Sequence, residues 1–350
     1  MLKFLKIFFI NIIILFFFII IYELFFGRWF NAKNFGNLFL PLNKYEIISN
    51  LPYKADQPIV YSTDEFGFRS NFKKLDTIEI LVVGGSTTEQ KLIDDEKIWT
   101  KVLEKNTKKN VLNAGIGGQT SFGHVEMFSI RFNRLPNLKP NLIIYYLGIN
   151  DAFFLLSKAQ DAKNKKTPTN GRIFNSINRD KLLHDNKLKN IAQYIKNNSA
   201  TVQLYKFIKG NYISFKYKFN YMNKKTTKFE TSSNNEIKIN FNSINSNILK
   251  QYQDLFNKNL RILQNMATKN DAYPIFITQK ISKNHWLNDY LKYINNITLK
   301  YCINDNLYCI DMSQENNLKD DFFYDGVHLN PKGSEILGDY ISQKIMNYKF

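Results

Sequence analysis

Four short blocks of the sequence carry residue types that could together perform chemistry on an acyl group through a serine. In chain order they are Gly84-Gly85-Ser86-Thr87-Thr88, Asn113-Ala114-Gly115-Ile116-Gly117-Gly118, Gly148-Ile149-Asn150-Asp151 and Asp325-Gly326-Val327-His328. The set supplies a nucleophile, donors for an oxyanion, and a base with a carboxylate beside it. Three of the blocks follow apolar, strand-like runs, so the ends of neighbouring strands could bring them together.

The first and last blocks supply the candidate nucleophile and base. Ser86 follows two glycines, where a tight turn can expose its hydroxyl and start a helix whose N–H groups face an anion. Taken alone, this block would more often be an ordinary turn or a phosphate-binding loop than a nucleophile. Asp325 and His328 are three residues apart, which lets the carboxylate hold the imidazole tautomer that accepts the serine proton. Taken alone, they could be a surface pair before the last helix.

The two middle blocks supply candidate oxyanion donors, namely the Gly118 N–H and the Asn150 amide, beside the backbone N–H of Ser86. A structural turn and a helix cap are the alternatives for the glycine and the asparagine. For His124 we expect a surface or supporting position rather than catalysis. Aromatic residues that could line an acyl pocket, although core packing is expected for most, are Trp99, Tyr145, Tyr146, Phe153, Phe154 and Trp286.

Alternating apolar runs predict the elements that must position these blocks. Continuous apolar runs are typical of parallel strands buried on both faces, and the sequence supports five. The strands are expected at Ile78 to Val83, Val111 to Asn113, Leu142 to Leu147, Tyr273 to Thr278 and Leu307 to Ile310. Helices are expected at Glu96 to Lys105, Phe122 to Phe132, Leu287 to Ile297 and Pro331 to Met346. This order predicts a parallel sheet with helices on both faces.

In their order and spacing, the four blocks resemble those of the SGNH (GDSL-type) hydrolases, which are named for a Ser, a Gly, an Asn and a His. The resemblance covers about Phe66 to the carboxyl terminus apart from an insertion. The Gly-Phe-Arg at 67–69 also resembles membrane-anchored bacterial members of the family. Gly85 stands where the GDSL signature has Asp, and the block is similar to a common Gly-Gly-Ser-Thr-Thr variant.

The resemblance implies a flavodoxin-like three-layer αβα sandwich and serine hydrolase chemistry on esters. It makes Ser86 the nucleophile, His328 the base and Asp325 its partner. Gly118 and Asn150 become the oxyanion donors together with the Ser86 N–H. The substrate is not implied, because the family spans lipids, carbohydrate acetates and thioesters.

Three functions are therefore considered. The first is a membrane-anchored serine esterase that hydrolyses carboxylic esters of a lipid or an O-acetylated glycan. The second is a polysaccharide O-acetyltransferase that uses the same triad and passes the acyl group to a sugar hydroxyl. The third is a non-catalytic, tethered glycan-binding or assembly protein. The joint presence of Ser86, Asn150 and His328 argues against the third, because a binding module needs none of these roles.

The start of the chain predicts a membrane anchor. Residues 7–24 are almost all Ile, Leu and Phe, and a run of about 18 apolar residues is near the minimum that spans a bilayer. Nothing after Glu23 resembles a small-residue cleavage site, which disfavours a removed signal peptide. Lys3 and Lys6 favour a cytoplasmic amino terminus, only weakly because Arg28 lies beyond the other end. This topology places the catalytic domain on the periplasmic or extracellular side.

We expect three parts: an anchor at 1–27, a leading region at 28–77 that packs on the catalytic domain, and a hydrolase domain at 78–350. An insertion at about 154–269 interrupts the hydrolase domain. It is expected to be partly helical and to hold a polar loop from Asn223 to Asn235. It could shape the substrate pocket, form a lid or bind a partner.

The composition of the chain limits which classes of binding partner are expected. The formal charge of +18 comes from lysines spread along the whole chain, with no basic helix, aromatic platform or zinc spacing, so nucleic-acid binding is not expected. Attraction to anionic lipid or polymer stays open. No cofactor or metal is indicated, and oligomeric state is not predicted. Cys302 and Cys309 could form a disulfide worth about 2.5 kcal/mol or stay as two buried thiols, and the disulfide is favoured.

Overall fold

The computed structural model describes residues 2–27, 29, 40, 44–49, 51–70, 73–130, 132, 135, 137–164, 195, 199–202, 204–205, 208 and 241–348. Its centre is a five-stranded parallel sheet in the order β4-β3-β5-β6-β7. The strands are β3 (Ile80–Gly84), β4 (Val111–Asn113), β5 (Leu142–Tyr146), β6 (Tyr273–Ile277) and β7 (Cys309–Ile310). This is the flavodoxin-like doubly wound order, in which ligands bind beyond the carboxyl ends of the first and third strands. The predicted parallel sheet is confirmed.

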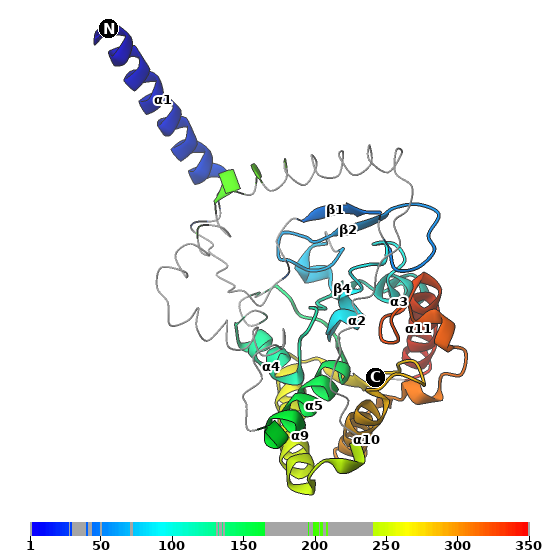
Figure 1. Cartoon of the computed structure of the whole chain (residues 1–350). Helices are drawn as coiled ribbons and strands as arrows, with labels where there is room; N and C mark the ends of the chain where they lie inside the picture. Colours follow the sequence, from blue (N-terminus) through cyan, green and yellow to red (C-terminus); the bar gives the residue numbers. More distant parts are fainter. Residues whose placement is uncertain are drawn as a thin grey trace.

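Alternate residues of each strand enter two separate hydrophobic clusters, because successive side chains of a strand point to opposite faces. Leu81 and Val83 of β3 belong to one cluster, whereas Ile80 and Val82 belong to the other. The first face packs on α4 (Ser121–Ile130), α5 (Ile149–Asn164), α9 (Ser246–Thr268) and α10 (Asn288–Asn304). The second packs on α3 (Trp99–Thr107) and α11 (Pro331–Met346). Figure 1 shows the two groups of helices on opposite sides of the sheet, which confirms the three layers.

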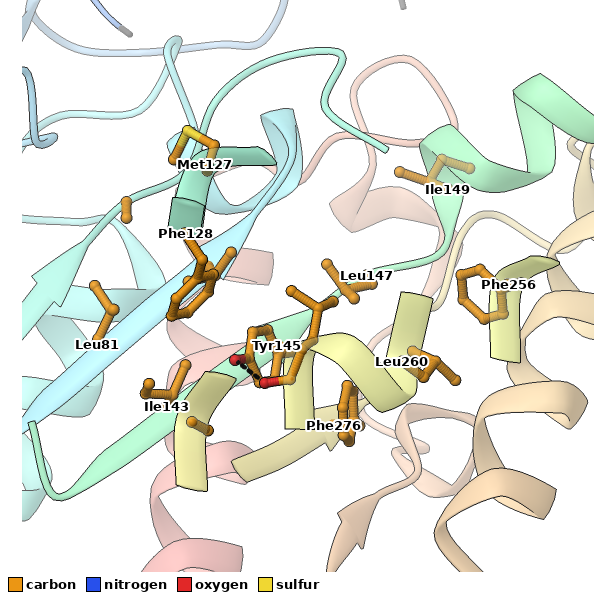
Figure 2. Packing of buried hydrophobic residues seen from close by; sticks show 14 of the residues in the cluster. Leu81, Met127, Phe128, Ile143, Tyr145, Leu147, Ile149, Phe256, Leu260 and Phe276 are labelled. Atoms are coloured by element: carbon orange, nitrogen blue, oxygen red, sulfur yellow. Dashed lines mark hydrogen bonds between the residues drawn. The ribbon is translucent and has the colours of Figure 1, made fainter. Parts of the chain in front are cut away.

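Tyr145 is the centre of the larger cluster. Its ring stacks on Phe276 of β6 with the ring centroids 4.9 Å apart. Its hydroxyl donates a hydrogen bond of 2.8 Å to the carbonyl oxygen of Leu263 in α9, the interaction dashed in Figure 2. A fully buried tyrosine is therefore satisfied, and α9 is tied to the sheet by a polar bond as well as by packing.

The two helices on the other face approach each other closely. A methyl group on Gly338 of α11 would lie 2.5 Å from Cβ of Val102 in α3, so only glycine permits this contact. The α11 helix begins as the sequence predicts, with Pro331 in the first turn and the Asn330 side chain accepting from the N–H of Gly333. The last block of site residues directly precedes α11, so the packing of α11 on α3 also limits where that block can lie.

The remaining described elements lie around this sandwich. The long helix α1 (Leu2–Phe26) extends away from it, whereas β1 (Tyr45–Ile48) and β2 (Ile59–Ser62) form an antiparallel hairpin beside it (Figure 1). The sequence reasoning did not predict this hairpin. Short helical turns are α2 (Ser86–Glu89), η1 (Leu75–Thr77), η3 (Phe241–Ser243), η4 (Met312–Gln314) and η5 (Asp320–Phe322).

Several element boundaries differ from the predicted ones, most of all the end of α10, which runs to Asn304 rather than Ile297. Two of the other differences have a local cause. The α3 helix starts at Trp99 rather than Glu96, because the Trp99 N–H is capped by Oε1 of Gln90. The β7 strand starts at Cys309 rather than Leu307, because the Leu307 N–H turns back to the carbonyl of Cys302 at the end of α10. A disulfide joins Cys302 to Cys309 across this turn, as favoured from the sequence.

The segment predicted as an insertion contains part of the sandwich. The helix α5 runs on to Asn164, and α9 buries Phe256 and Leu260 in the larger cluster. The polar stretch from Asn223 to Asn235 lies outside the described residues, and the predicted helical stretch at 187–209 is described only at 195, 199–202, 204, 205 and 208.

Candidate active site

Ser86 lies at the carboxyl end of β3, where the strand turns directly into α2. Gly85 precedes Ser86 as the N-cap residue of α2 and has an extended backbone conformation. A methyl group on Gly85 would lie 2.3 Å from Nδ2 of Asn150, so the glycine lets the third block approach the serine. Because Ser86 is the first residue of this helical turn, its N–H has no partner within the turn.

His328 connects Ser86 with Asp325. Nε2 of His328 is 2.7 Å from Oγ of Ser86, and Nδ1 is 2.7 Å from Oδ2 of Asp325. With the Nδ1 proton donated to the carboxylate, Nε2 is the acceptor for the serine hydroxyl. Ser86 and His328 are 242 residues apart in the chain, and the fold brings them into hydrogen-bond contact.

The Asp325 carboxylate is fixed by its own loop. Its Oδ1 accepts from the N–H groups of Val327 and His328 at 3.0 and 2.7 Å. Burial alone would raise the pKa of Asp325, but the hydrogen bonds and charge of His328 outweigh it and hold that pKa below its ordinary value. The carboxylate therefore stays ionised at neutral pH and can stabilise a protonated imidazole.

The second and third blocks meet beside the serine. Gly118 has a φ of +81 degrees, in the left-handed region that favours glycine. Among the backbone hydrogen bonds of the described residues, none uses the Gly118 N–H as donor. Nδ2 of Asn150 donates to the carbonyl of Gln119 at 2.9 Å, and an amide has a second N–H to offer. The structure thus gathers all five predicted site residues at one edge of the sheet.

Comparison with known protein families finds one match. The sequence profile of the GDSL-like lipase/acylhydrolase family matches residues 82–336. The chain belongs to this family. It is therefore a serine hydrolase of the class that acts on ester bonds, as the resemblance of the blocks implies. A comparison with curated protein sequences finds no match.

Several solved structures are similar to this chain at low sequence identity. A lipolytic G-D-S-L protein from Veillonella parvula DSM 2008 is 11% identical with a TM-score of 0.43, over 77% of this chain and 100% of that one. The psychrotrophic esterase EstA from Pseudoalteromonas sp. is 14% identical with a TM-score of 0.42, over 77% and 97%. A mutant acetyl-xylooligosaccharide esterase from Geobacillus Stearmophilus is 12% identical with a TM-score of 0.40, over 78% and 95%.

One residue that joins the blocks of this acylhydrolase was missed from the sequence. Oε1 of Gln279 accepts from the N–H of Ile149 at 2.6 Å, and its Nε2 donates to Oγ1 of Thr87 at 2.9 Å. The side chain therefore ties the third block to the first. The available signal was its place just after the end of β6, next to the strand that carries Asn150.

Asp151, next to Asn150, is a buried carboxylate that links the start of α5 to the start of α4. It is 1% exposed and accepts from the backbone N–H and hydroxyl of Ser121 at the start of α4, and from the hydroxyl of Tyr252. Burial raises its pKa to about 6, although these hydrogen bonds oppose the rise. Asp151 therefore fixes where α4 begins, after the loop that carries Gly118.

The six aromatic residues named from the sequence separate into two groups. Phe153 and Trp286 are partly buried and meet edge to face, with ring centroids 5.4 Å apart. His285 stacks on Trp286, and a methyl group on Gly326 would contact the His285 ring, so this group reaches the histidine loop. The other four are buried in the two cores: Trp99, Tyr145, Tyr146 and Phe154.

Two further aromatic side chains, Tyr324 and His124, lie in positions that the sequence did not indicate. Tyr324 stacks on His328 with ring centroids 5.7 Å apart and an interplanar angle of 13 degrees, a contact that the sequence did not indicate. His124 is fully buried in α4, not at the surface, and burial lowers its pKa to about 3, so it is neutral at pH 7.

No group of three His, Cys, Asp or Glu side chains that could hold a metal ion occurs among the described residues.

Proposed function

We propose that the chain is a membrane-anchored serine esterase that hydrolyses carboxylic esters through an acyl-enzyme on Ser86. The observation that carries the proposal is the continuous hydrogen-bonded path from Oγ of Ser86 through His328 to Asp325, with both contacts of the imidazole at 2.7 Å. A serine, a base and an orienting carboxylate in this geometry are the requirements for nucleophilic attack on an ester.

In the acylation step, Nε2 of His328 takes the proton of Ser86 while Oγ bonds to the ester carbonyl carbon. The carbonyl electron pair moves onto oxygen, and the N–H groups of Ser86 and Gly118 with the Asn150 amide donate to that oxyanion. When the intermediate collapses, the bond to the alcohol oxygen breaks, and the alcohol leaves with the proton held by His328. The acyl group then remains on Ser86.

Deacylation repeats the same sequence with water. His328 takes a proton from the water, whose oxygen bonds to the acyl carbon, and the same donors hold the second oxyanion. Collapse breaks the bond to Oγ of Ser86, which recovers its proton from His328, and the acid leaves. Asp325 stays ionised throughout, which agrees with the lowered pKa of its carboxyl.

The substrate proposed is an ester of a lipid or of an acylated carbohydrate. Phe153 follows Asn150 by three residues on α5, so the two lie on neighbouring turns of one helix face. The contact between Phe153 and Trp286 continues that face toward the histidine loop. Such rings can pack against an acyl chain or the apolar face of a sugar. Acyl length and alcohol are to be ranked by experiment.

The anchor is part of the proposal because α1 is long and apolar enough to cross a membrane, a property that a signal sequence shares. Contacts of Glu23 favour a retained helix. Its carboxylate accepts from Oγ of Ser199 and from the N–H groups of Ala200 and Thr201 at 2.6, 2.9 and 2.9 Å. Removal of α1 would leave these groups of the distant segment without their acceptor. The disulfide supports an oxidising compartment for the catalytic domain, with the amino terminus cytoplasmic.

The esterase is tested with the full chain in detergent, using p-nitrophenyl esters of short and medium acyl length and a fluorophosphonate probe. We expect turnover and a probe adduct on Ser86, both absent in Ser86→Ala and unchanged in Ser313→Ala, which alters an exposed serine. A folded wild-type protein that neither turns over nor labels would contradict the proposal. An added glycan that captures the acyl group in place of water would make the chain an acetyltransferase.

The anchor is tested by expressing the full chain in bacteria and extracting the membrane fraction. Mass spectrometry of the extracted protein is expected to find the peptides of residues 1–27 still attached. A protein that begins after residue 27 would show a cleaved signal sequence instead. Protease added to sealed spheroplasts is expected to digest the catalytic domain, and protection from it would reverse the proposed topology.

A further inference from the structure

Glu89 is a buried carboxylate that the proposed chemistry does not use. It follows Ser86 by three residues at the end of α2 and is 6% exposed. Its Oε2 accepts from the N–H of Gly117 at 2.7 Å, and its Oε1 accepts from the hydroxyl of Tyr61 at 3.0 Å. Both oxygens therefore have partners, and one of those partners is the residue directly before Gly118.

The loop that carries Gly118 lies directly on Glu89. A methyl group on Gly115 would be 2.3 Å from the Glu89 N, and one on Gly117 would be 2.9 Å from Oε2 of Glu89. On the far side of Gly118, Asn150 donates to the carbonyl of Gln119 at 2.9 Å. The peptide that presents the Gly118 N–H is thus held from both sides, by Glu89 before it and by Asn150 after it.

The leading region holds Glu89 in turn. Arg69 is fully buried, its guanidinium lies 4.3 Å from the ring centroid of Tyr61, and its Nε donates to the carbonyl of Glu89 at 3.2 Å. Arg69 also forms an ion pair with Asp95. Burial, followed by the charge of Glu89, raises the pKa of Tyr61, so its hydroxyl stays protonated and remains a donor.

We propose that Glu89 is a positioning residue for the oxyanion site, which aims the Gly118 N–H by fixing Gly117, and that Tyr61 holds Glu89 in place. The inference rests on the esterase proposed above. Oxyanion donors stabilise a transition state only when they are fixed where the charge develops, and a misplacement of about 1 Å can cost about 100-fold in rate. Hydrogen bonds to Gly117, not the negative charge of Glu89, supply this effect.

Steady-state kinetics of the full chain separate the hydrogen bond from the charge. Glu89→Ala removes the acceptor and is expected to lower kcat about 10- to 100-fold with KM within about threefold. Glu89→Gln keeps a carbonyl for Gly117 and an amide for Tyr61, so its kcat should stay within about fivefold of wild type. Glu96→Ala, which alters an exposed glutamate, is the matched control and should change neither constant.

Each contrary result overturns the proposal. A Glu89→Ala protein with unchanged kcat per folded site would do so, and so would a Glu89→Gln protein that is as slow as Glu89→Ala. If Glu89→Ala does not fold, Tyr61→Phe removes only the hydroxyl that supports Oε1. It is expected to lower kcat about 2- to 10-fold, with unchanged KM, and an unaltered kcat would count against the proposal.

Hydrogen exchange provides a readout that needs no activity. The amides of residues 114–120 are expected to exchange at least about tenfold faster in Glu89→Ala than in wild type, and to be unaffected in Ser86→Ala and Glu96→Ala. Unchanged exchange in Glu89→Ala overturns the positioning role even if the esterase is confirmed. A wild-type protein without esterase activity whose loop still loosens in Glu89→Ala would reject the proposed function and keep the structural role of Glu89.

Discussion

The two halves of the site are built in different ways. In the half that holds the nucleophile and the oxyanion donors, Ser86 and Gly118 are half-buried. The side chains that support them are buried, with Glu89 6%, Asn150 7% and Asp151 1% exposed, and we call this the buried half. The half that holds the base is a short loop whose Asp325 and His328 side chains are 36% and 29% exposed. Many side chains from distant parts of the chain fix the first half, whereas the second is held chiefly by its own hydrogen bonds.

The difference follows from what each half must do. Oxyanion donors act through fixed geometry, and reorganisation during the reaction would waste their stabilisation. The imidazole instead exchanges protons with an incoming alcohol or water, so it must remain accessible to solvent and substrate. Rigid support is therefore concentrated around Gly118 and Asn150, and the base relies on Asp325 and on the stacked ring of Tyr324.

The largest expected effect comes from breaking the exposed half. Asp325→Asn should lower kcat by about 10⁴-fold, because a neutral amide can neither hold the required imidazole tautomer nor stabilise its charged form. The measurement is steady-state hydrolysis of a p-nitrophenyl ester, with Asp254→Asn, which alters an exposed aspartate of α9, as the control. A loss below about tenfold would show that the loop orients His328 without the carboxylate.

Removing one donor from the buried half should lower kcat less than Asp325→Asn does, because several donors share the charge of the oxyanion. Asn150→Ala is expected to lower kcat about 10²- to 10³-fold. Fluorophosphonate labelling should slow in parallel, since the phosphonyl oxygen uses the same donors. An Asn150→Ala protein that is folded and fully active would remove Asn150 from the oxyanion site.

The buried half should also carry a pH dependence of stability. Because burial raises the pKa of Asp151 to about 6, the folded protein binds this proton more tightly than the unfolded chain does. That contribution is complete below about pH 4 and is lost as the pH rises through about 6. Relative to Asp151→Asn, the free energy of unfolding of wild type should fall by about 2 to 3 kcal/mol between pH 4 and pH 7.5.

Urea unfolding of both proteins at the two pH values measures this difference. The two carboxylates of the two halves should behave in opposite ways. Asp325 has a lowered pKa, so its contribution to the free energy of unfolding is lost in acid, whereas that of Asp151 is lost as the pH rises. A difference in unfolding free energy that is constant across the pH range would show that Asp151 keeps its ordinary pKa in the folded state.

The smallest expected effect lies outside both halves. Replacing Cys302 and Cys309 together by serine should lower the free energy of unfolding by about 2.5 kcal/mol, through the lost constraint on the unfolded chain. The turnover number should not change, because Cys309 begins β7 whereas the site follows the carboxyl ends of the strands. A large loss of kcat in a folded double variant would show that this turn supports the site.

The sequence was sufficient for the parts of the fold that are locally encoded. Most strands of the sheet are continuous apolar runs. Gly84 ends β3, and Gly148 follows shortly after β5. Because parallel strands end at one edge, the blocks after β3, β4 and β5 were expected to meet. The family resemblance then joined His328 to Ser86, which no local pattern could do.

The supporting residues could not be predicted, since their roles depend on long-range contacts. Glu89 three residues after Ser86 reads as an ordinary polar position of a helix, and only the fold places Tyr61 against it. The β1–β2 hairpin was missed because its strands have four residues each, too few for a clear period. The core helix α9 was assigned to an insertion because it follows a long polar stretch of the chain.

The close contact of α11 with α3 through Gly338 has a consequence for the order in which the site is completed during synthesis. All oxyanion donors are present once Asn150 has been made, but the base arrives roughly 180 residues later, about 10 to 40 s at 5–20 residues per second. Until that last helix docks, Ser86 is an ordinary alcohol. A growing or truncated chain is therefore harmless to the esters around it, and reactivity marks a finished molecule.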